Sequence, residues 1–93
     1  MEVKYSITLH PLVTANDIPR LDTFWRITIR NAVREKITKS PELYGKPLRQ
    51  SLKGCRSLRV GDYRVVFQIK SRIVHLVAIV HRSSKYRGIE RRI

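Results

Sequence analysis

The segment from Tyr63 to Val80 constrains the fold most, because it predicts two β-strands with only a short turn between them. Residues 63–70 carry an apolar side chain at every second position, the period of a strand with one buried face. Residues 73–80 are apolar at odd and even positions alike except for His75, a pattern typical of a strand near the centre of a sheet. The turn near Ser71 is too short for a parallel connection, so we expect antiparallel pairing.

The chain before this hairpin begins with one strand and two helices. Residues 3–9 alternate between apolar and polar side chains and predict a strand, which Pro11 ends. Residues 14–21 predict a short helix, whose length Pro19 limits. A longer helix follows at residues 23–39. Its apolar residues at helical spacing are Trp25, Ile29, Ala32, Val33 and Ile37.

The boundaries of the later elements are marked by capping and turn residues. Asp22 supplies a side-chain oxygen that can cap the longer helix, and Ser40–Pro41 ends it. Residues 44–54 are rich in glycine and proline and predict a loop. A further strand at residues 55–60 then leads into a tight turn at Gly61, where glycine tolerates a positive φ.

These elements predict a single α+β domain of residues 1–93. We expect a curved antiparallel β-sheet of about four strands, with the two helices of the N-terminal half packed on one face. The alternating apolar side chains of residues 63–69 would face these helices. The second apolar face of residues 73–80 would then lie in an open, cationic groove.

Positive charge is concentrated in the half of the chain that forms these strands. Thirteen of the twenty Lys and Arg residues lie between Lys46 and Ile93, and only Asp62 and Glu90 oppose them, so this half carries a formal charge of +11. Such an excess destabilises a small domain through self-repulsion, so we expect a polyanionic partner, with nucleic acid the leading candidate.

Several classes of function find no support in the sequence. Cys55 is the only cysteine and His10, His75 and His81 are scattered, so no metal-ligand spacing is present. No glycine-rich loop leads from a strand into a helix, and we expect no cofactor. A lone cysteine fits a reducing compartment, and neither a membrane span nor the apolar block of a signal peptide is present, so we expect a cytoplasmic protein.

The remaining candidates for chemistry are arginine, lysine, tyrosine and histidine side chains. This set can cleave RNA, because the ribose 2′-hydroxyl is a built-in nucleophile that needs only orientation, charge stabilisation and proton transfer. The same residues also suit simple binding, which composition alone favours. Each has a structural alternative as well: Arg64 in a surface ion pair, His81 closing a strand, or Tyr86 packed on the sheet.

Three motifs in order resemble the RelE/ParE toxin superfamily. The first is the run Arg59–Phe67, which contains an arginine strand, a Gly-Asp turn and Tyr-Arg before an apolar strand. The second is the loop of Pro41 and Gly45–Leu48 upstream of the sheet. The third is Ile79–Arg82, a last strand ending in His-Arg, with Tyr86 shortly after it.

The resemblance implies the toxin half of a prokaryotic type II toxin–antitoxin system. In the RelE branch the toxin enters the ribosomal A site and cuts the mRNA there, and we expect this ribosome-dependent endonuclease activity. In the ParE branch the toxin inhibits DNA gyrase and has no nuclease activity, and a non-catalytic nucleic-acid-binding module is a third alternative. The expected partners are the ribosome, mRNA and a cognate antitoxin that is acidic and partly disordered.

The resemblance also implies roles for individual residues. Arg64 would contact the scissile phosphate, Arg82 would bind phosphate and protonate the leaving oxygen, and Tyr86 would stack on the nucleotide. His81 would act as acid or base. Residues expected to bind nucleic acid are Lys53, Arg56, Arg59, Lys85 and Arg87.

Two departures from the family pattern concern this site. The middle strands lack the glutamate that some family nucleases use as a base, and Ser57 stands where other members carry Lys or Arg. Asp62 lies in the turn and is interpreted as structural. The nuclease hypothesis therefore depends on Arg64 and Arg82 converging on one phosphodiester at the uncovered side of the sheet.

Overall fold

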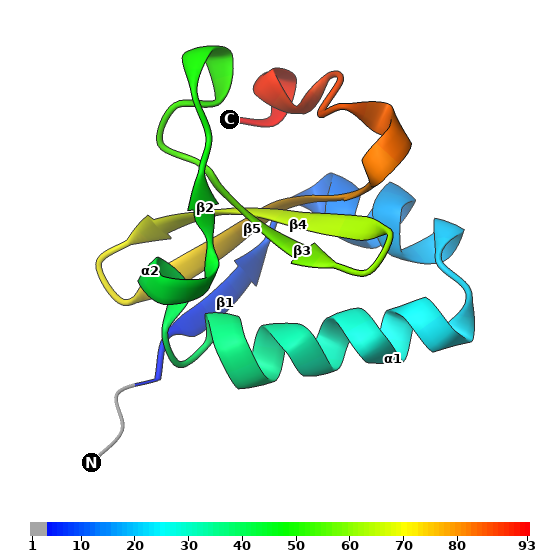
Figure 1. The fold of residues 1–93 in the computed structure, drawn as a ribbon, viewed down its shortest axis with the longest axis horizontal. Helices are drawn as coiled ribbons and strands as arrows, with labels where there is room; N and C mark the ends of the chain where they lie inside the picture. The colour runs from blue at the N-terminus through cyan, green and yellow to red at the C-terminus, as the bar shows by residue number, and fades with distance from the viewer. Residues whose placement is uncertain (1–3) are drawn as a thin grey trace.

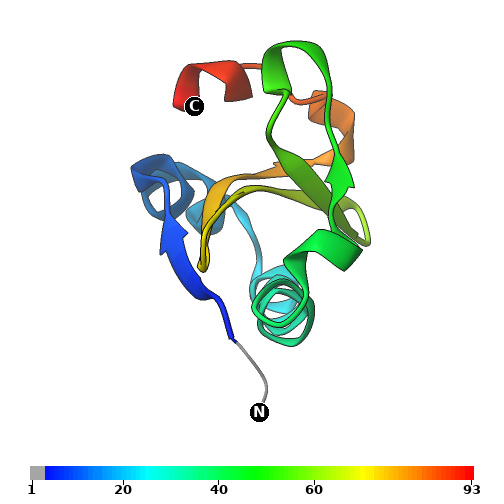
Figure 2. The ribbon, with the colours of Figure 1, turned by 90° about the vertical axis from the view of Figure 1, so that its left-hand side faces the viewer.

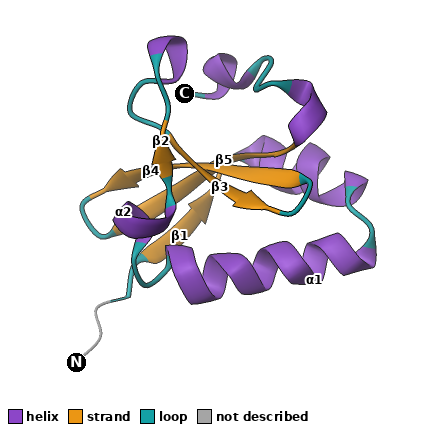
Figure 3. Ribbon diagram, in the orientation of Figure 1, coloured by secondary structure: helices purple, strands orange, loops and turns teal. Residues whose placement is uncertain are grey.

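The computed structural model describes residues 4–93, which form one five-stranded sheet with helical segments on both sides (Figure 1, Figure 3). The strands are β1 (Ser6–Leu9), β2 (Lys46–Pro47), β3 (Arg56–Val60), β4 (Tyr63–Lys70) and β5 (Ile73–His81). The α-helices are α1 (Thr23–Ala32), which continues as a wider helical turn at Val33–Ile37, and α2 (Pro41–Tyr44). Shorter helical turns lie at Val13–Asp17, Ile18–Arg20, Gln50–Leu52, Arg82–Ser84 and Ile89–Arg92.

The strand order is β1-β5-β4-β3-β2, in which β1 is parallel to β5 and all other neighbours are antiparallel. The predicted α+β class is confirmed, with two differences in detail. Lys46–Pro47 adds a fifth strand, and the N-terminal strand is parallel to β5, which the long connection between these two strands permits. Val3, which belongs to the predicted N-terminal strand, lies outside the described residues.

Helix α1 begins where the sequence predicts, because Asp22 caps it. The Asp22 carboxylate accepts a hydrogen bond from the Trp25 backbone N–H at 3.0 Å. The helical path continues to Ile37 and packs along one face of the sheet, opposite the C-terminal end of the chain (Figure 2). Among the described residues, none of the helices has both the length and the apolar character needed to cross a bilayer.

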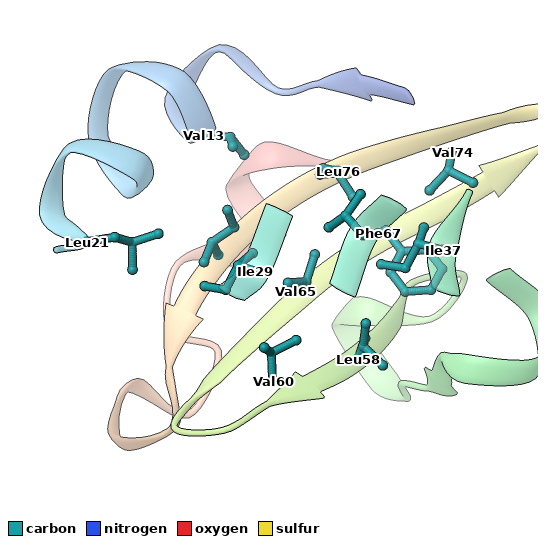
Figure 4. Packing of buried hydrophobic residues seen from close by; sticks show 12 residues of the cluster. Val13, Leu21, Ile29, Ile37, Leu58, Val60, Val65, Phe67, Val74 and Leu76 are labelled. Atoms are coloured by element: carbon teal, nitrogen blue, oxygen red, sulfur yellow. The ribbon is translucent and has the colours of Figure 1, made fainter. Parts of the chain in front are cut away.

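The larger hydrophobic cluster fills the space between the sheet and the helices (Figure 4). Val65 and Phe67 of β4 are fully buried there, while Tyr63 and Ile69 pack at its margin, so the predicted inward face of residues 63–69 is confirmed. Its buried members are Val13, Leu21, Ile29, Val33, Ile37, Leu58, Val60, Val65, Phe67, Val74, Leu76 and Ile79. This cluster therefore joins the helical N-terminal half to the strands of the C-terminal half.

The opposite side of the sheet, which we call the distal face, is covered too. The C-terminal segment (residues 82–93) and the turn before β3 pack over it, and Val66, Val77 and Ala78 are buried beneath Ile89. The predicted open groove over this face is therefore wrong. The basic tail contributes a deeply buried Ile89 to the core, and no hydrophobic periodicity around that residue indicates it in the sequence.

A β-bulge in β5 changes the direction in which its side chains point. The register pairs Val66 with Ala78 but Phe67 with Leu76, so Val77 is an extra residue on β5. Leu76 faces α1, whereas Val77 and Ala78 both belong to the distal cluster. Residues of β5 beyond the bulge therefore lie on the face opposite to the one that strict alternation predicts.

Asp17 and Arg92 form an ion pair at the edge of β5 beyond the end of β1, which stops opposite Leu76. The two terminal nitrogens of Arg92 donate to the two Asp17 carboxylate oxygens at 2.7 and 3.1 Å. Arg92 also donates to the Val77 carbonyl at 3.1 Å, and Asp17 accepts from the Ile79 N–H at 2.9 Å. The pair thus satisfies two backbone groups that no neighbouring strand covers.

The hydrogen bonds to Asp17 favour its ionised form. Burial alone would raise the pKa of this carboxyl, but hydrogen bonds from Arg92, the Ile79 N–H and Asn16 outweigh it, so the pKa lies below its usual value. Because the folded-state pKa is the lower one, the carboxylate stabilises the fold above the unfolded pKa of about 3.9. That contribution is lost as the pH falls through the folded pKa.

We predict that Gly61→Ala destabilises the fold more than Gly88→Ala. Both glycines have positive φ, +59° and +77°, so an alanine would cost each about 1–2 kcal/mol from the backbone. At Gly61 the added methyl would also collide with the Trp25 ring, whereas nothing lies within 4 Å of it at Gly88. The collision should add about 1–3 kcal/mol. Urea unfolding measures both, and equal losses would show that the Trp25 contact contributes nothing.

We predict that Asp17→Asn lowers the free energy of unfolding by about 3–5 kcal/mol at neutral pH, because Arg92 is left buried without a charged partner. The deficit should shrink as the pH falls from the unfolded pKa of about 3.9 through the lower folded-state pKa, because the unfolded carboxylate is protonated first and the folded one only afterwards. Urea unfolding of both proteins across the acidic range measures the deficit. A deficit that does not change with pH would contradict the role given to this carboxylate.

Candidate functional site

Four side chains from β3, β4 and the C-terminal segment meet on the distal face. Arg59 lies directly opposite Arg64 in the β3–β4 register, so their side chains share one face, and Ser57 lies on it two residues earlier. The Tyr86 hydroxyl donates to the Ser57 hydroxyl oxygen at 3.0 Å, and the Arg64 guanidinium lies 5.6 Å from the Tyr86 ring centre. We call Ser57, Arg59, Arg64 and Tyr86 the distal-face cluster.

An unusual backbone turn brings Tyr86 back over the sheet. Lys85 and Tyr86 have φ values of 52° and 62°, in the left-handed region that residues other than glycine rarely adopt. The hydrogen bond to Ser57 on one side and the burial of Ile89 on the other hold this conformation. Backbone strain of this kind is concentrated at functional sites, so the turn singles out Tyr86 as a functional candidate.

Arg64 presents a positive charge with no acidic partner. Among residues 4–93, the only ion pairs are Arg82–Asp62 and Arg92–Asp17, so no carboxylate neutralises Arg64. Its guanidinium lies over the Tyr86 ring, an arrangement favoured by the attraction between a cation and an aromatic face. The N–H groups at the edge of a guanidinium match two oxygens of a phosphate, which makes Arg64 suited to bidentate phosphate binding.

Arg59 places a second cation beside Arg64. Its Nε donates to the Gly61 carbonyl at 3.3 Å, which holds the exposed side chain near the β3–β4 turn. Like charges directly opposite each other on a sheet destabilise it. Two adjacent guanidinium groups that no described carboxylate separates therefore favour the binding of a polyanion at this end of the sheet.

Arg82 lies at the rim of the cluster, two residues after Val80, the partner of Arg64 in the β4–β5 register. Its Nε is 3.7 Å from an Asp62 carboxylate oxygen, and the two side chains are 61% and 53% exposed. An ion pair so exposed contributes at most about 1 kcal/mol, so Arg82 can exchange Asp62 for a phosphate at little cost. The Arg82 guanidinium is therefore not locked within the fold.

The structure does not bring His81 into the distal-face cluster. His81 pairs with Tyr63 across β4–β5, and their ring centres are 5.2 Å apart in an edge-to-face contact on the α1 side. Its Nδ1 accepts from the Ser83 backbone N–H at 3.2 Å and lies 2.9 Å from the Ser83 hydroxyl, which leaves Nε2 for other partners. The bulge at Val77 explains this placement, because it moves the end of β5 by one residue.

Comparison with known proteins identifies the family. The family model described as "ParE toxin of type II toxin-antitoxin system, parDE" matches residues 14–86. This chain belongs to the RelE/ParE family of toxins. The toxin RelE of Mycobacterium tuberculosis is 37% identical to it over 75 residues, which are 78% of this chain and 77% of that protein.

Solved structures of two related proteins share the fold of this RelE/ParE toxin. The toxin–antitoxin complex RelBE2 from Mycobacterium tuberculosis contains a chain with a TM-score of 0.80 at 25% identity, covering 87% of this chain and 94% of that chain. A mutant of the Escherichia coli toxin RelE in the free state gives a TM-score of 0.74 at 21% identity, covering 97% and 98%. The resemblance drawn from the sequence motifs is thus confirmed, and the protein is a type II toxin–antitoxin toxin.

The other basic residues singled out in the toxin sequence divide into two groups. Lys85 and Arg87 are exposed on either side of Tyr86, and the exposed Lys53 follows the turn that packs against the C-terminal segment. Arg56 is different, because its Nη1 donates to the Glu42 and Gly45 carbonyls at 3.3 and 3.0 Å. Arg56 therefore holds the loop before β2, on the face of β3 opposite to Ser57.

The residue types that bind metals are dispersed in the described part of the toxin, and its cysteine is buried. In the described part of the toxin, no three His, Cys, Asp or Glu side chains lie close enough together to hold a metal ion. Cys55 is 1% exposed, and burial raises the pKa of its thiol although a hydrogen bond with Gln68 opposes that rise. A buried thiol that resists ionisation is a structural residue.

Sequence reasoning missed three residues that hold the C-terminal segment of the toxin on the sheet. Ser57 appeared only as a departure from the family pattern, although its small buried hydroxyl positions Tyr86. Asp17 and Arg92 are far apart in the sequence and no local pattern links them. A signal existed only for Asp17, since an acidic residue on the buried side of a helical segment indicates a paired charge.

We predict that Ser57 and Tyr86 are energetically coupled. Ser57→Ala, Tyr86→Phe and the double variant form a cycle in which each single change removes the hydrogen bond and leaves the Tyr86 ring in place. The coupling energy should be about 1 kcal/mol, the net value of a neutral hydrogen bond in a partly buried setting. Urea unfolding of the four proteins gives this energy, and strictly additive effects would show that the hydrogen bond does not hold Tyr86.

Proposed function

We propose that this toxin is a ribosome-dependent mRNA endonuclease. The observation that carries the proposal is the Arg64 guanidinium beside the Tyr86 ring, next to Arg59 and without an acidic partner among the described residues. A phosphate-binding group beside an aromatic ring matches the two parts of a nucleotide, its phosphodiester and its base. The identity to a toxin named RelE supports the same branch of the family.

The chemistry starts from the RNA itself. The 2′-hydroxyl gives its proton to solvent water as its oxygen attacks the adjacent phosphorus. The bond from phosphorus to the 5′ oxygen of the next nucleotide breaks, and that oxygen takes a proton from water, so a 2′,3′-cyclic phosphate and a 5′-hydroxyl result. Arg64 would stabilise the additional negative charge on the phosphoryl oxygens in the transition state. Tyr86 would stack on a flanking base, and Arg82 at the rim would neutralise the departing oxygen.

The cluster contains no carboxylate that could act as a base. Much of the acceleration of RNA cleavage would therefore come from orienting the 2′-hydroxyl toward the phosphorus. The four members of the cluster are a serine, two arginines and a tyrosine, and the Tyr86 hydroxyl already donates a hydrogen bond to Ser57. An oriented intramolecular nucleophile reacts with effective molarities of about 10⁵–10⁸ M. A ribosome that holds mRNA in one conformation would supply this orientation, which is our reason for including ribosome dependence in the proposal.

An acidic antitoxin is the partner that the surface supports. An apolar groove of about 440 Å³ runs between α1 and the strands β1 and β5, and Leu9 and Ile27 in its lining are 42% and 44% exposed. Arg26, Arg30 and Arg34 of the same helical stretch line the groove at i, i+4 spacing. An amphipathic helix with acidic flanks would satisfy both features. The related RelBE2 toxin was solved in complex with an antitoxin.

Gyrase inhibition is the second candidate, because the matching family model describes the ParE toxins. In that branch the resemblance implies binding to a protein and no nuclease activity. The two candidates differ in cells. Brief expression of a nuclease leaves new mRNA 5′ ends inside translated regions, whereas a gyrase inhibitor leaves messages intact and stalls replication.

We predict that Arg64→Ala lowers mRNA cleavage in a reconstituted translation system by about 10²–10³-fold, the size expected when one transition-state charge stabiliser is removed. Arg72→Ala is the matched control, because it removes the same charge from the exposed β4–β5 turn at the other end of the strands. Its cleavage rate should stay near that of the wild type. An Arg64→Ala toxin that cuts as fast as the Arg72→Ala control would remove Arg64 from the site.

A further inference from the structure

We propose that Asp17 and Arg92 are positioning residues for the distal-face cluster, because their ion pair holds the C-terminal segment in the place where Tyr86 meets Arg64. This inference rests on the proposed function for its consequence in RNA cleavage. Its structural part concerns the conformation of Tyr86 and can be tested without RNA. Among the described residues, neither Asp17 nor Arg92 forms a hydrogen bond or ion pair with a member of the cluster.

The ion pair is attached to the rigid centre of the sheet. Arg92 donates a hydrogen bond to the Val77 carbonyl and Asp17 accepts one from the Ile79 N–H, so the pair is bonded to the backbone of β5 on either side of Ala78. Ala78 itself is fully buried beneath the C-terminal segment. The pair therefore fixes one end of that segment relative to β5. It does so beside the bulge at Val77, the residue that has no partner in the pairing with β4.

Few other interactions hold the C-terminal segment. Its inner backbone hydrogen bonds are local and long: the Ile89 N–H donates to the Tyr86 carbonyl at 3.4 Å and the Arg91 N–H to the Gly88 carbonyl at 3.2 Å. At its start the segment is held by the Arg82 N–H, which donates to the Asp62 carbonyl at 2.8 Å, and by the exposed Arg82–Asp62 ion pair. Farther along, the contacts with the sheet are those of Tyr86 with Ser57 and Arg64, the buried Ile89 side chain and the Asp17–Arg92 pair. Tyr86, Ile89 and Arg92 follow one another at every third residue, so the loss of the Arg92 contact would loosen its neighbours next.

Tyr86 depends on this support more than an ordinary surface tyrosine would. Its own φ of 62° and that of Lys85, 52°, are unfavourable, so the free chain would leave this conformation if nothing held it. The turn persists only while contacts on both of its sides are made. Arg92, through Ile89, supplies the contact on the C-terminal side and thereby keeps the Tyr86 ring over Arg64.

The structural test uses Arg92→Gln, with Arg91→Gln as the matched control, because Arg91 is exposed and carries the same charge. Hydrogen exchange should rise in residues 84–93 of Arg92→Gln and stay at the wild-type level in β4. The Ser57–Tyr86 coupling energy, measured again in the Arg92→Gln background, should fall to near zero. Arg91→Gln should change neither quantity, and a purely stabilising role of Arg92 would leave the coupling intact.

The functional test measures cleavage by the same variants in the reconstituted translation system. We expect Arg92→Gln to lower kcat by about 10–100-fold, the loss typical of a small displacement of a positioned group, with KM nearly unchanged because Arg59 and Arg64 still bind phosphate. Arg92→Lys, which keeps the charge but cannot form the forked contact, should recover part of the loss.

The outcomes separate this inference from the proposed function. If the wild-type toxin cuts no RNA, the proposed function fails, and the exchange and coupling measurements still decide whether Arg92 positions Tyr86. Unchanged coupling, or full cleavage despite a loosened C-terminal segment, would overturn the inference. If Arg92→Gln fails to fold, the same three measurements on Arg92→Lys decide, with partial loss in all three as the supporting result.

Discussion

The fold depends on one constraint: strand β5 is apolar on both faces and has to be covered on both sides by a chain of 93 residues. Helix α1 and the N-terminal helical turns cover one side, and the short C-terminal segment covers the other. The candidate site lies at the end of the distal face near the β3–β4 turn, where Arg59 and Arg64 lie opposite each other beyond the part that this segment covers.

The C-terminal segment contributes both to the core and to the candidate site. Ile89 completes the second core, and Tyr86, three residues earlier, forms the upper wall of the cationic site. Packing and chemistry therefore share one short stretch of backbone whose shape includes two unfavourable φ values. Substitutions within this segment are therefore expected to affect the core and the candidate site together.

The sequence predicted those parts of the fold that local patterns determine. Alternation from Tyr63 to Ile69, the Asp22 cap and the turn at Gly61 were all confirmed, because each depends on neighbours in the chain. The placement of His81 could not be predicted, because the extra residue Val77 turns each later side chain of β5 to the opposite face of the sheet. The contacts of Arg56 could not be predicted for a similar reason, because the Glu42 and Gly45 carbonyls to which it donates belong to a segment that sequence patterns do not place beside β3.

The Asp17–Arg92 pair also bears on the solubility of the protein. The segment Ile73–Val80 is an apolar stretch of high β-propensity, the composition that stacks into fibrils when a strand edge is left open. Beyond Leu76 none of the described strands pairs with its outer edge, yet the Val77 carbonyl and the Ile79 N–H are occupied by charged side chains. A second molecule that extended the sheet there would first have to displace this salt bridge, and that cost opposes pairing of the exposed strand edge.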